Sequence, residues 1–448
     1  MLRVAVVGSG PAGVYAAGAL AEHHEAVDVF DRLPCPFGLV RYGVAPDHEK
    51  IRSITATLHR VFEQPNVRFL GNVEVGRDIT VADLHEHYDA VLVACGSALG
   101  RRLGVPGEDL PGSFSATDFV AWYCGHPDAQ VDRFTLEARS VVVVGLGNVA
   151  LDVARLLAKD IDALRQTDMP EHVLRVLADS KVEEVSIVGR RGPAQARFST
   201  KELRELGDIA GADVVVDPAD LELDEASEAA VAADATLRRN LEVLRGWAER
   251  PAAGRPRRVH LRFLQRPDAV LGEGRVSGVQ VERTVLDGSG GAAGTGQLSV
   301  LDAQLVLCSV GYRGLAIPGL PFDERDGVIP NAGGRVLRDG EPVPGEYVAG
   351  WIKRGPTGVI GTNKHDAHET VRALLEDLER LPRAPHREPA DVDRLLAARG
   401  VQVVGWNGWR AIDQAELALG VASGRRRVKI SEREALLRAA VADASAAR

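Results

Sequence analysis

Short apolar runs separated by turns and amphipathic stretches recur along the chain. The run at residues 3–7 (RVAVV) predicts a buried parallel strand, and a helical pattern with Ala17 on its inner face continues to about His23. Because strand-like runs alternate with helical stretches, the pattern predicts an α/β fold with parallel sheets. Further apolar runs of the same kind predict strands at residues 26–30, 140–144, 185–188 and 304–308.

A glycine-rich turn, GSGPAG, follows the first predicted strand and opens the first predicted helix. This spacing is the dinucleotide-binding fingerprint, in which the first glycine permits a tight turn and the second lets backbone approach a pyrophosphate. The third glycine lets helix and strand pack closely, and the helix N-terminus offers N–H groups to the phosphates. We therefore expect cofactor contacts from Gly8, Gly10, Pro11, Ala12 and Gly13.

The second predicted strand ends in an acidic residue, Asp31. A carboxylate at this point accepts hydrogen bonds from a ribose and repels a 2′-phosphate. The first site therefore suits FAD or NAD rather than NADP.

A second turn of the same kind, GLGNVA, follows the apolar run at 140–144, with alanine at the third glycine position. Its next strand runs into Arg190 and Arg191 instead of an acid, and two guanidiniums there can hold a 2′-phosphate through charge-assisted bonds. This pattern predicts an NADP(H) site, although the two arginines also fit an ordinary arginine-rich surface. The predicted contacts of the turn are Gly145, Leu146, Gly147, Asn148 and Val149.

Two nucleotide sites of different preference indicate a flavoprotein in which NADPH delivers hydride to FAD. A late glycine-rich turn at 353–364 precedes a helix expected from about Asp366 to Leu381, and its N-terminus is placed to stabilise charge on a reduced flavin. Trp351 either flanks the flavin ring or packs in the core. The irregular segment 31–50 can wrap the flavin, with His48 as a polar neighbour or as a structural residue.

Composition and charge exclude several other classes. The chain of 448 residues has a formal net charge of −9, which argues against general nucleic-acid binding. Its four cysteines lack metal-ligand or dithiol spacing, so no metal site is expected and a reducing compartment is favoured. No signal sequence or apolar run of membrane-spanning length is visible, and we therefore expect no membrane association and a cytoplasmic location.

Longer motifs make the chain resemble the adrenodoxin reductase-like ferredoxin–NADP(+) reductases, especially their actinobacterial members. The matching stretches are spread from residue 4 to about residue 430, and related disulphide reductases share only the phosphate turns. These stretches are GSGPAG, PFGLVRYGVAPDHEKIR, GNVEVGRD, GLGNVALDVAR, VGRRGPAQARFSTKELREL, GWIKRGPTGVIGTNK and WNGWRAIDQAE.

The resemblance implies site residues that the pattern alone does not. The family usually carries Glu where this chain has Asp31, and the shorter acid should still reach the ribose. His48 and Asp152 look like the polar residues that the family places near flavin and nicotinamide, and we expect them at the catalytic centre. The implied FAD contacts are Ala12, Asp31, Gly38, Leu39, Val75, Trp351, Gly358, Val359 and Ile360, and the implied NADP contacts are residues 146–149, Arg190, Arg191, Glu202 and Gly358.

The resemblance also implies a transient partner, an iron–sulfur ferredoxin that can feed a haem monooxygenase. Because ferredoxins are usually acidic, docking needs a basic face on this acidic chain. Arg204 is supported by the resemblance, whereas the other candidates rest on charge pattern and also fit a solvated surface. These others are Arg197, Lys201, Arg238, Arg239 and Arg245, and the chain is expected to be a monomer or weak dimer.

The expected architecture is two Rossmann-like three-layer domains, with the NADP domain (105–319) inserted in an FAD domain formed by 1–104 and 320–448. Residues 158–182 are expected to form an inserted helical excursion, and residues 286–298 a hairpin tip. Four other functions stay open beside the reductase. They are an NADPH-dependent oxidase or diaphorase, the electron-input subunit of a glutamate synthase-like complex, a disulphide reductase and a non-catalytic FAD-holding protein.

Overall fold

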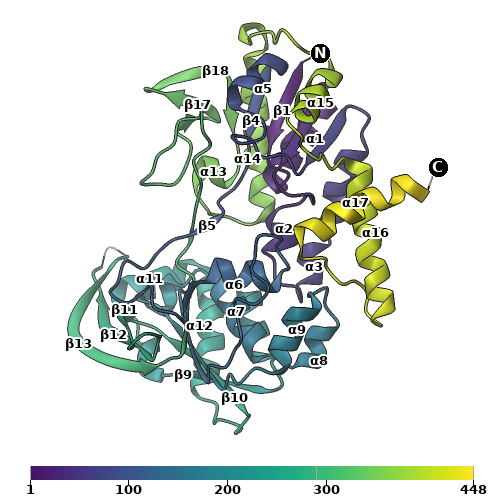
Figure 1. Cartoon of the computed structure of the whole chain (residues 1–448). Coiled ribbons are helices and arrows are strands. Elements are labelled where there is room, and N and C mark those ends of the chain that lie inside the picture. The colour runs from purple at the N-terminus through teal and green to yellow at the C-terminus, as the bar shows by residue number, and fades with distance from the viewer. Residues whose placement is uncertain (1, 289, 447–448) are drawn as a thin grey trace. The chain divides into compact units, whose positions relative to one another are not determined.

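The computed structural model describes residues 2–288 and 290–446, which form two compact units (Figure 1). The first unit combines the described residues up to Leu99 with Cys124–Asp128 and those from Tyr312 onward. The second unit consists of Gly100–Tyr123 and the described part of Ala129–Gly311. The sequence placed divisions after residues 104 and 319, whereas the compact units divide after Leu99 and Gly311.

A seven-stranded sheet forms the centre of the first unit, in the order β16-β17-β18-β4-β1-β2-β3. The five strands from β18 to β3 are parallel, and β16 and β17 add an antiparallel edge. The parallel strands put their carboxyl ends along one edge of the sheet, where ligands of doubly wound folds bind. The strands are β1 (Arg3–Val7), β2 (Ala26–Asp31), β3 (Val67–Gly71), β4 (Ala90–Val93), β16 (Asn331–Ala332), β17 (Arg335–Arg338) and β18 (Glu341–Val348).

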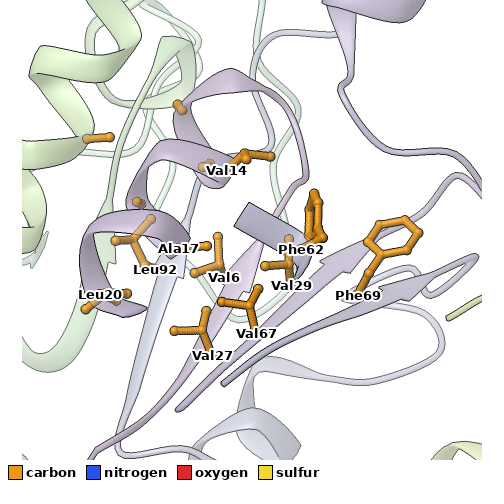
Figure 2. Packing of buried hydrophobic residues seen from close by; sticks show 14 of the residues in the cluster. Val6, Val14, Ala17, Leu20, Val27, Val29, Phe62, Val67, Phe69 and Leu92 are labelled. Carbon is orange, nitrogen blue, oxygen red and sulfur yellow. The ribbon is translucent and has the colours of Figure 1, made fainter. Parts of the chain in front are cut away.

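Both faces of this sheet are buried. Alternate residues of β1 enter different clusters, with Val4 and Val6 in one and Ala5 and Val7 in the other. This explains why the strand is apolar without interruption and confirms the expected layer on each face. Figure 2 shows one cluster, in which α1 side chains face the sheet; its labelled members are Val6, Val14, Ala17, Leu20, Val27, Val29, Phe62, Val67, Phe69 and Leu92.

Helices from both ends of the chain cover the first sheet. Helix α1 (Pro11–Glu22) packs against α14 (Ile360–Glu376), so segments far apart in sequence share one layer. The remaining helices are α2 (Leu39–Tyr42), α3 (Glu49–Arg52), α4 (Thr55–His59), α5 (Val81–His87), α13 (Trp351–Arg354), α15 (Pro389–Ala398), α16 (Trp406–Ala422) and α17 (Arg433–Ala446), with single helical turns at Arg60–Glu63 and Leu378–Arg380.

The second unit contains a six-stranded sheet in the order β6-β14-β7-β8-β10-β9, and every pairing in it is parallel. The strands are β6 (Ser113–Ser115), β7 (Ser140–Val144), β8 (Glu184–Val188), β9 (Ala212–Val216), β10 (Arg257–Arg262) and β14 (Leu305–Cys308). The short strands β5 (Leu99–Gly100) and β15 (Tyr312–Arg313) pair with each other where the chain passes between the units.

The two faces of the second sheet are covered differently. Helix α7 (Asn148–Ala158) packs on β7, β8 and β10. On the other face, Val142 and Val144 lie against an antiparallel sheet of β11 (Gln265–Leu271), β12 (Gly278–Leu286) and β13 (Ala292–Asp302). The remaining helices are α6 (Ala116–Tyr123), α8 (Ile161–Arg165), α9 (Glu171–Ala178), α10 (Thr200–Gly207), α11 (Glu225–Ala233) and α12 (Ala235–Ala248), with single turns at Pro193–Gln195 and Pro218–Leu221.

Two local predictions about helices have different outcomes. The excursion at 158–182 is helical, as expected, and contains α8 and α9. The helix expected from Asp366 to Leu381 is wrong at both ends, because α14 begins at Ile360 and ends at Glu376. Its start is fixed by Thr362, whose Oγ1 accepts a hydrogen bond from the Val359 N–H at 3.2 Å.

The expected hairpin tip at 286–298 is shorter than predicted. Strand β13 already begins at Ala292, which leaves a tip around Asp287 and Gly291; Ser289 lies outside the described residues. Across the described chain, none of the helices combines the length and the apolar character that crossing a membrane requires.

Candidate dinucleotide sites

Two glycines of the first turn are required by the packing of the fold itself. Gly8 has φ +109°, and a Cβ there would lie 2.5 Å from the Ala94 carbonyl oxygen. A Cβ at Gly13 would lie 1.9 Å from the Gly8 carbonyl oxygen. The turn and the start of α1 can therefore form only without side chains at these two positions.

Gly10 is different, because nothing in the chain requires a glycine there. Its φ of −69° and ψ of 176° suit any residue, and a Cβ would meet nothing within 4 Å. Gly147 in the second turn is also extended, with open space where its Cβ would be. An open position beside a helix N-terminus in each unit fits a pyrophosphate that approaches the backbone.

Asp31, at the end of β2, is held by the first turn. Its Oδ2 accepts hydrogen bonds from the N–H and the hydroxyl of Ser9, and its Oδ1 accepts one from the Leu33 N–H at 2.9 Å. Burial raises the pKa of Asp31, although the hydrogen bonds to Ser9 and Leu33 act against it. A carboxylate oxygen has two acceptor positions, so Oδ1 retains capacity for a ribose hydroxyl.

The irregular segment after Asp31 lies against the first turn. The Phe37 N–H donates to the Ser9 carbonyl at 2.9 Å, and a Cβ at Gly38 would lie 3.1 Å from the Gly10 Cα. Both Phe37 and Gly38 have positive φ, at 81° and 47°, which is unusual for phenylalanine. Leu39 then opens α2 with a partly exposed side chain beside this contact.

His48 and Val75 lie in the same unit as this turn. His48 is buried, precedes α3, and donates its backbone N–H to the Ala45 carbonyl at 3.0 Å. Val75 is partly buried against the sheet face that carries Ala5 and Val7.

The late glycine-rich segment also belongs to the first unit. Trp351 opens α13, its ring centroid lies 5.4 Å from that of Tyr312, and its Nε1 donates to the Thr357 carbonyl at 3.2 Å. Gly358 has φ +84°, and Val359 leaves 69% of its surface exposed. An apolar side chain exposed at the start of α14, next to Ile360, is available for contact with a ligand ring.

Arg190 and Arg191 follow β8 in the second unit. Arg190 is exposed and Arg191 half-buried, and the Arg191 Nη1 donates to the Gly290 carbonyl at 3.3 Å. Burial lowers the pKa of Arg191, and the positive charges of Arg197 and Arg190 lower it further. The charges of Arg190 and Arg197 thus both act on Arg191, and such a group of guanidiniums suits a phosphate.

Arg197, which the sequence analysis assigns to a partner surface, lies near this arginine pair. Its backbone N–H donates to the Leu146 carbonyl at 2.8 Å, which joins its segment to the second turn. Two residues later, the Ser199 N–H donates to the Asn148 Oδ1 at 2.8 Å. This bond fixes the start of α10 on the same turn. The GPAQARFS stretch after the arginine pair was the available signal, because it returns the chain to the turn.

Two acidic residues are buried near the second turn. Asp152 lies on α7 and pairs with the Arg155 Nη1 at 2.6 Å, in a contact that is largely shielded from solvent. Glu202 is buried on α10, which packs against α7. The structure thus brings both predicted residues to the helices that adjoin this turn.

The predicted partner surface carries charges of both signs. Lys201 and Arg204 are exposed on α10, which packs against α12, the helix that carries the other arginines. Lys201 pairs with Glu205 at 3.6 Å. The exposed basic residues of α12 are Arg238, Arg239 and Arg245, and the exposed acids are Glu242 on the helix and Glu249 directly after it.

None of the four cysteines, all of which lie in the described part of the chain, forms a disulphide. Cys35, Cys124 and Cys308 are buried and Cys95 is exposed, so the chain holds no dithiol of the kind a disulphide reductase uses. Within residues 2–288 and 290–446, no three His, Cys, Asp or Glu side chains form a group able to hold a metal ion.

Comparison with known proteins first identifies the class of protein to which the chain is similar. Residues 2–206 match the pyridine nucleotide-disulphide oxidoreductase family. The chain is 47% identical to the NADPH-ferredoxin reductase FprA of Mycobacterium tuberculosis, over 97% of this chain and 98% of that protein. It is 39% identical to the mitochondrial NADPH:adrenodoxin oxidoreductase of Arabidopsis thaliana, over 98% of this chain and 95% of that one.

A solved structure agrees with these relatives. The structure of Mycobacterium tuberculosis FprA in complex with NADPH matches with a TM-score of 0.92 at 46% identity, and the match covers 98% of this chain and 99% of that one. The chain belongs to the NADPH–ferredoxin reductase family that includes FprA and the adrenodoxin reductases. The resemblance and the α/β fold class predicted from the sequence are confirmed, and the protein is an oxidoreductase.

Proposed function

We propose that the protein is an NADPH–ferredoxin reductase that holds FAD at the first turn and NADP(H) at the second. Bound FAD supplies the chemistry, because it accepts a hydride from NADPH and returns electrons one at a time. The polypeptide binds and orients the two nucleotides and shields them from water.

The observation that carries this proposal is the opposite charge at two similar strand ends. Asp31 follows β2 in the first unit, whereas Arg190 and Arg191 follow β8 in the second. A carboxylate excludes a 2′-phosphate and guanidiniums attract one. The two sites therefore take different nucleotides, as a reductase that passes electrons from NADPH to FAD needs.

In the first unit, the open face of Gly10 and the N-terminus of α1, with Pro11 and Ala12, receive the pyrophosphate, and Asp31 receives the ribose. The segment at Gly38 and Leu39 covers the cofactor from one side. Val75, Trp351 and Gly358–Ile360 are assigned to the flavin end.

In the second unit, the open face of Gly147 and the N-terminus of α7 receive the NADP(H) pyrophosphate. The 2′-phosphate is assigned to Arg190 and Arg191, with Arg197 as a third positive charge. Glu202 completes the proposed NADP(H) contacts of this unit.

His48 and Asp152 are assigned to the flavin and the nicotinamide, respectively. His48 is buried, so its ring can hydrogen-bond with little competition from water. Asp152 is held by Arg155, and an ion-paired carboxylate acts as a hydrogen-bond acceptor. Both are proposed to orient the reacting rings.

The proposed electron acceptor is an acidic iron–sulfur ferredoxin that docks on α10 and α12. Arg204, Arg238 and Arg239 are exposed there and can attract an acidic partner despite the net charge of −9. We also propose a cytoplasmic location, which the four free cysteines favour.

A flavin spectrum of the purified full-length protein, followed by NADPH-driven cytochrome c reduction with and without ferredoxin, tests the proposal. We expect a visible flavin spectrum and a cytochrome c rate that rises strongly when ferredoxin is added. A colourless protein that cannot be reconstituted with FAD would disprove the cofactor assignment. Oxygen consumption at the same rate without ferredoxin would instead identify an oxidase.

A further inference from the structure

Helix α16, the helix before the C-terminal one, packs against the segment that lies on the first glycine-rich turn. This helix begins with WNGWRAIDQAE, a motif that the proposed chemistry does not use. It forms part of the hydrophobic cluster that also contains Phe37 and Val40. The helix is therefore connected to the proposed FAD site through packed side chains.

Trp409 makes the first contact along this route. Its ring centroid lies 5.9 Å from that of Phe37, edge to face at 86°, and the Arg41 guanidinium lies 5.0 Å from its centroid. Trp409 is almost fully buried. Such aromatic and cation–π contacts fix the direction of the side chains involved.

Glu416, two turns further along α16, makes the second contact. Its side chain is fully buried, and its Oε1 lies 2.5 Å from the Arg41 Nη2. Both carboxylate oxygens have further donors, since the Ile430 N–H binds Oε1 and the Arg427 Nη1 binds Oε2, each at 2.9 Å. Burial acts to lower the pKa of Arg41, but the charge and hydrogen bond of Glu416, together with Tyr42 and Cys35, keep that pKa above its usual value.

One of the residues that α16 holds, Phe37, touches the turn, and the other, Arg41, follows in the same short segment. Phe37 donates its backbone N–H to the Ser9 carbonyl, and the next residue, Gly38, approaches the Gly10 Cα. Arg41 lies on the helix that begins directly after Gly38. The Arg41 carbonyl also accepts a hydrogen bond from the Lys429 Nζ at 2.6 Å. Residues near the C-terminus therefore bind both the side chain and the backbone of Arg41.

We infer that Trp409 and Glu416 are positioning residues that hold the 37–42 segment over the first turn and so set the affinity of that site for its dinucleotide. Neither residue contacts the turn; they act through Phe37 and Arg41. The positive φ of Phe37 makes this support necessary, because a strained backbone persists only when its surroundings hold it. Without this support, the dinucleotide has to order the segment when it binds, and the lost conformational entropy lowers its affinity. The inference rests on the proposed function in taking this dinucleotide to be FAD.

The main test compares two buried acids of the first unit in full-length protein. Glu416→Gln removes the charge that Arg41 needs, whereas the control Asp89→Asn removes an equally buried carboxylate that binds Arg387 at 2.7 Å. Asp89 precedes β4, at the opposite end of that strand from Ala94, which adjoins Gly8. Both variants should unfold at lower temperature, because each removes the charge of a fully buried carboxylate that binds an arginine.

The readout is the dissociation constant of FAD, measured by flavin fluorescence on protein from which the flavin has been removed. We expect Glu416→Gln to raise this constant about tenfold or more, through loss of a charge-assisted bond, while Asp89→Asn changes it less than about twofold. Equal changes in both variants would mean that Glu416 acts only through global stability and would overturn the inference. An unchanged constant in Glu416→Gln would overturn it as well.

Trp409→Leu keeps the test decisive if Glu416→Gln does not fold. It removes the ring that faces Phe37 without leaving a buried charge, so it should weaken FAD binding in the same direction. Wild-type affinity in Trp409→Leu would overturn the inference. The dissociation constant of NADP⁺ should stay unchanged in all three variants. Failure of the proposed function is distinguishable, because then the unmodified protein itself would not bind FAD.

Discussion

The two units contain the same turn but surround it differently. In each, a strand enters a G-x-G-x-x-[GA] turn, the first glycine is forced by close backbone contact, and the second faces open space. In the first unit the next strand ends in one hydrogen-bonded acid, and in the second it ends in a group of guanidiniums. Under the proposed function, the turn provides each nucleotide site, whereas the charge at the neighbouring strand end selects the nucleotide.

The largest expected effect comes from removing the positive charges of the second unit. Replacing both Arg190 and Arg191 by Leu should raise KM for NADPH about a hundredfold, because two charge-assisted contacts to a phosphate are lost. KM for NADH, measured in the same cytochrome c assay, should stay nearly unchanged. Equal losses for both coenzymes would contradict the assignment of the 2′-phosphate.

Removing the acid of the first unit should weaken the binding of FAD rather than that of NADPH. Asp31→Ala removes a ribose acceptor and also frees the Ser9 and Leu33 donors that shape the turn. FAD binding should weaken about thirtyfold, the scale of one or two hydrogen bonds to a charged group. Fluorescence titration measures this, and NADPH affinity serves as the control. A shift in NADPH affinity with FAD affinity intact would reverse the proposed assignment of the two units.

The open glycines allow a matched pair of substitutions. Gly10→Ala and Gly147→Ala each add a methyl group where the chain leaves room, so the unfolding temperature should hardly change. Ligand affinity should fall about tenfold, because the methyl group keeps a pyrophosphate from the backbone. Calorimetry should find the loss for FAD in the first variant and for NADP⁺ in the second. Any other pairing of variant and ligand would break the comparison.

The smallest expected effect separates two arginines seven positions apart. Arg204→Glu should raise KM for ferredoxin several-fold and weaken its dependence on salt, since one docking charge is reversed. Reduction of a small dye should be unaffected. Arg197→Glu is the counterpart, and it should raise KM for NADPH instead because Arg197 adjoins the arginine pair. A dye rate that falls equally in Arg204→Glu would rule out the docking role.

The strands were predictable because burial on both faces leaves a continuous apolar signal. The runs at 3–7 and 140–144 are β1 and β7 with the same bounds. The start of α14 was missed because its first turn, IGTNKH, is largely exposed and therefore polar, and it resembles a loop in sequence. The antiparallel layer of the second unit was also missed, since strand patterns do not tell which sheet a strand joins.

The site was predictable where one local motif contains the chemistry. The turns and the strand-end charges are of this kind. The place of Arg197 beside the second turn could not be predicted, because it depends on a backbone bond to Leu146, about fifty positions away. Trp409 and Glu416 gave no signal of their role, because their partners Phe37 and Arg41 lie at the other end of the chain.

The discontinuous first sheet also constrains how the protein is made. Strand β4 pairs on one side with β1 and on the other with β18, which the ribosome synthesises about 250 residues later. The edge of β4 that pairs with β18 therefore stays open until most of the second unit has been synthesised. Such long-range pairing is slow, so closing this sheet is expected to be a late step of folding.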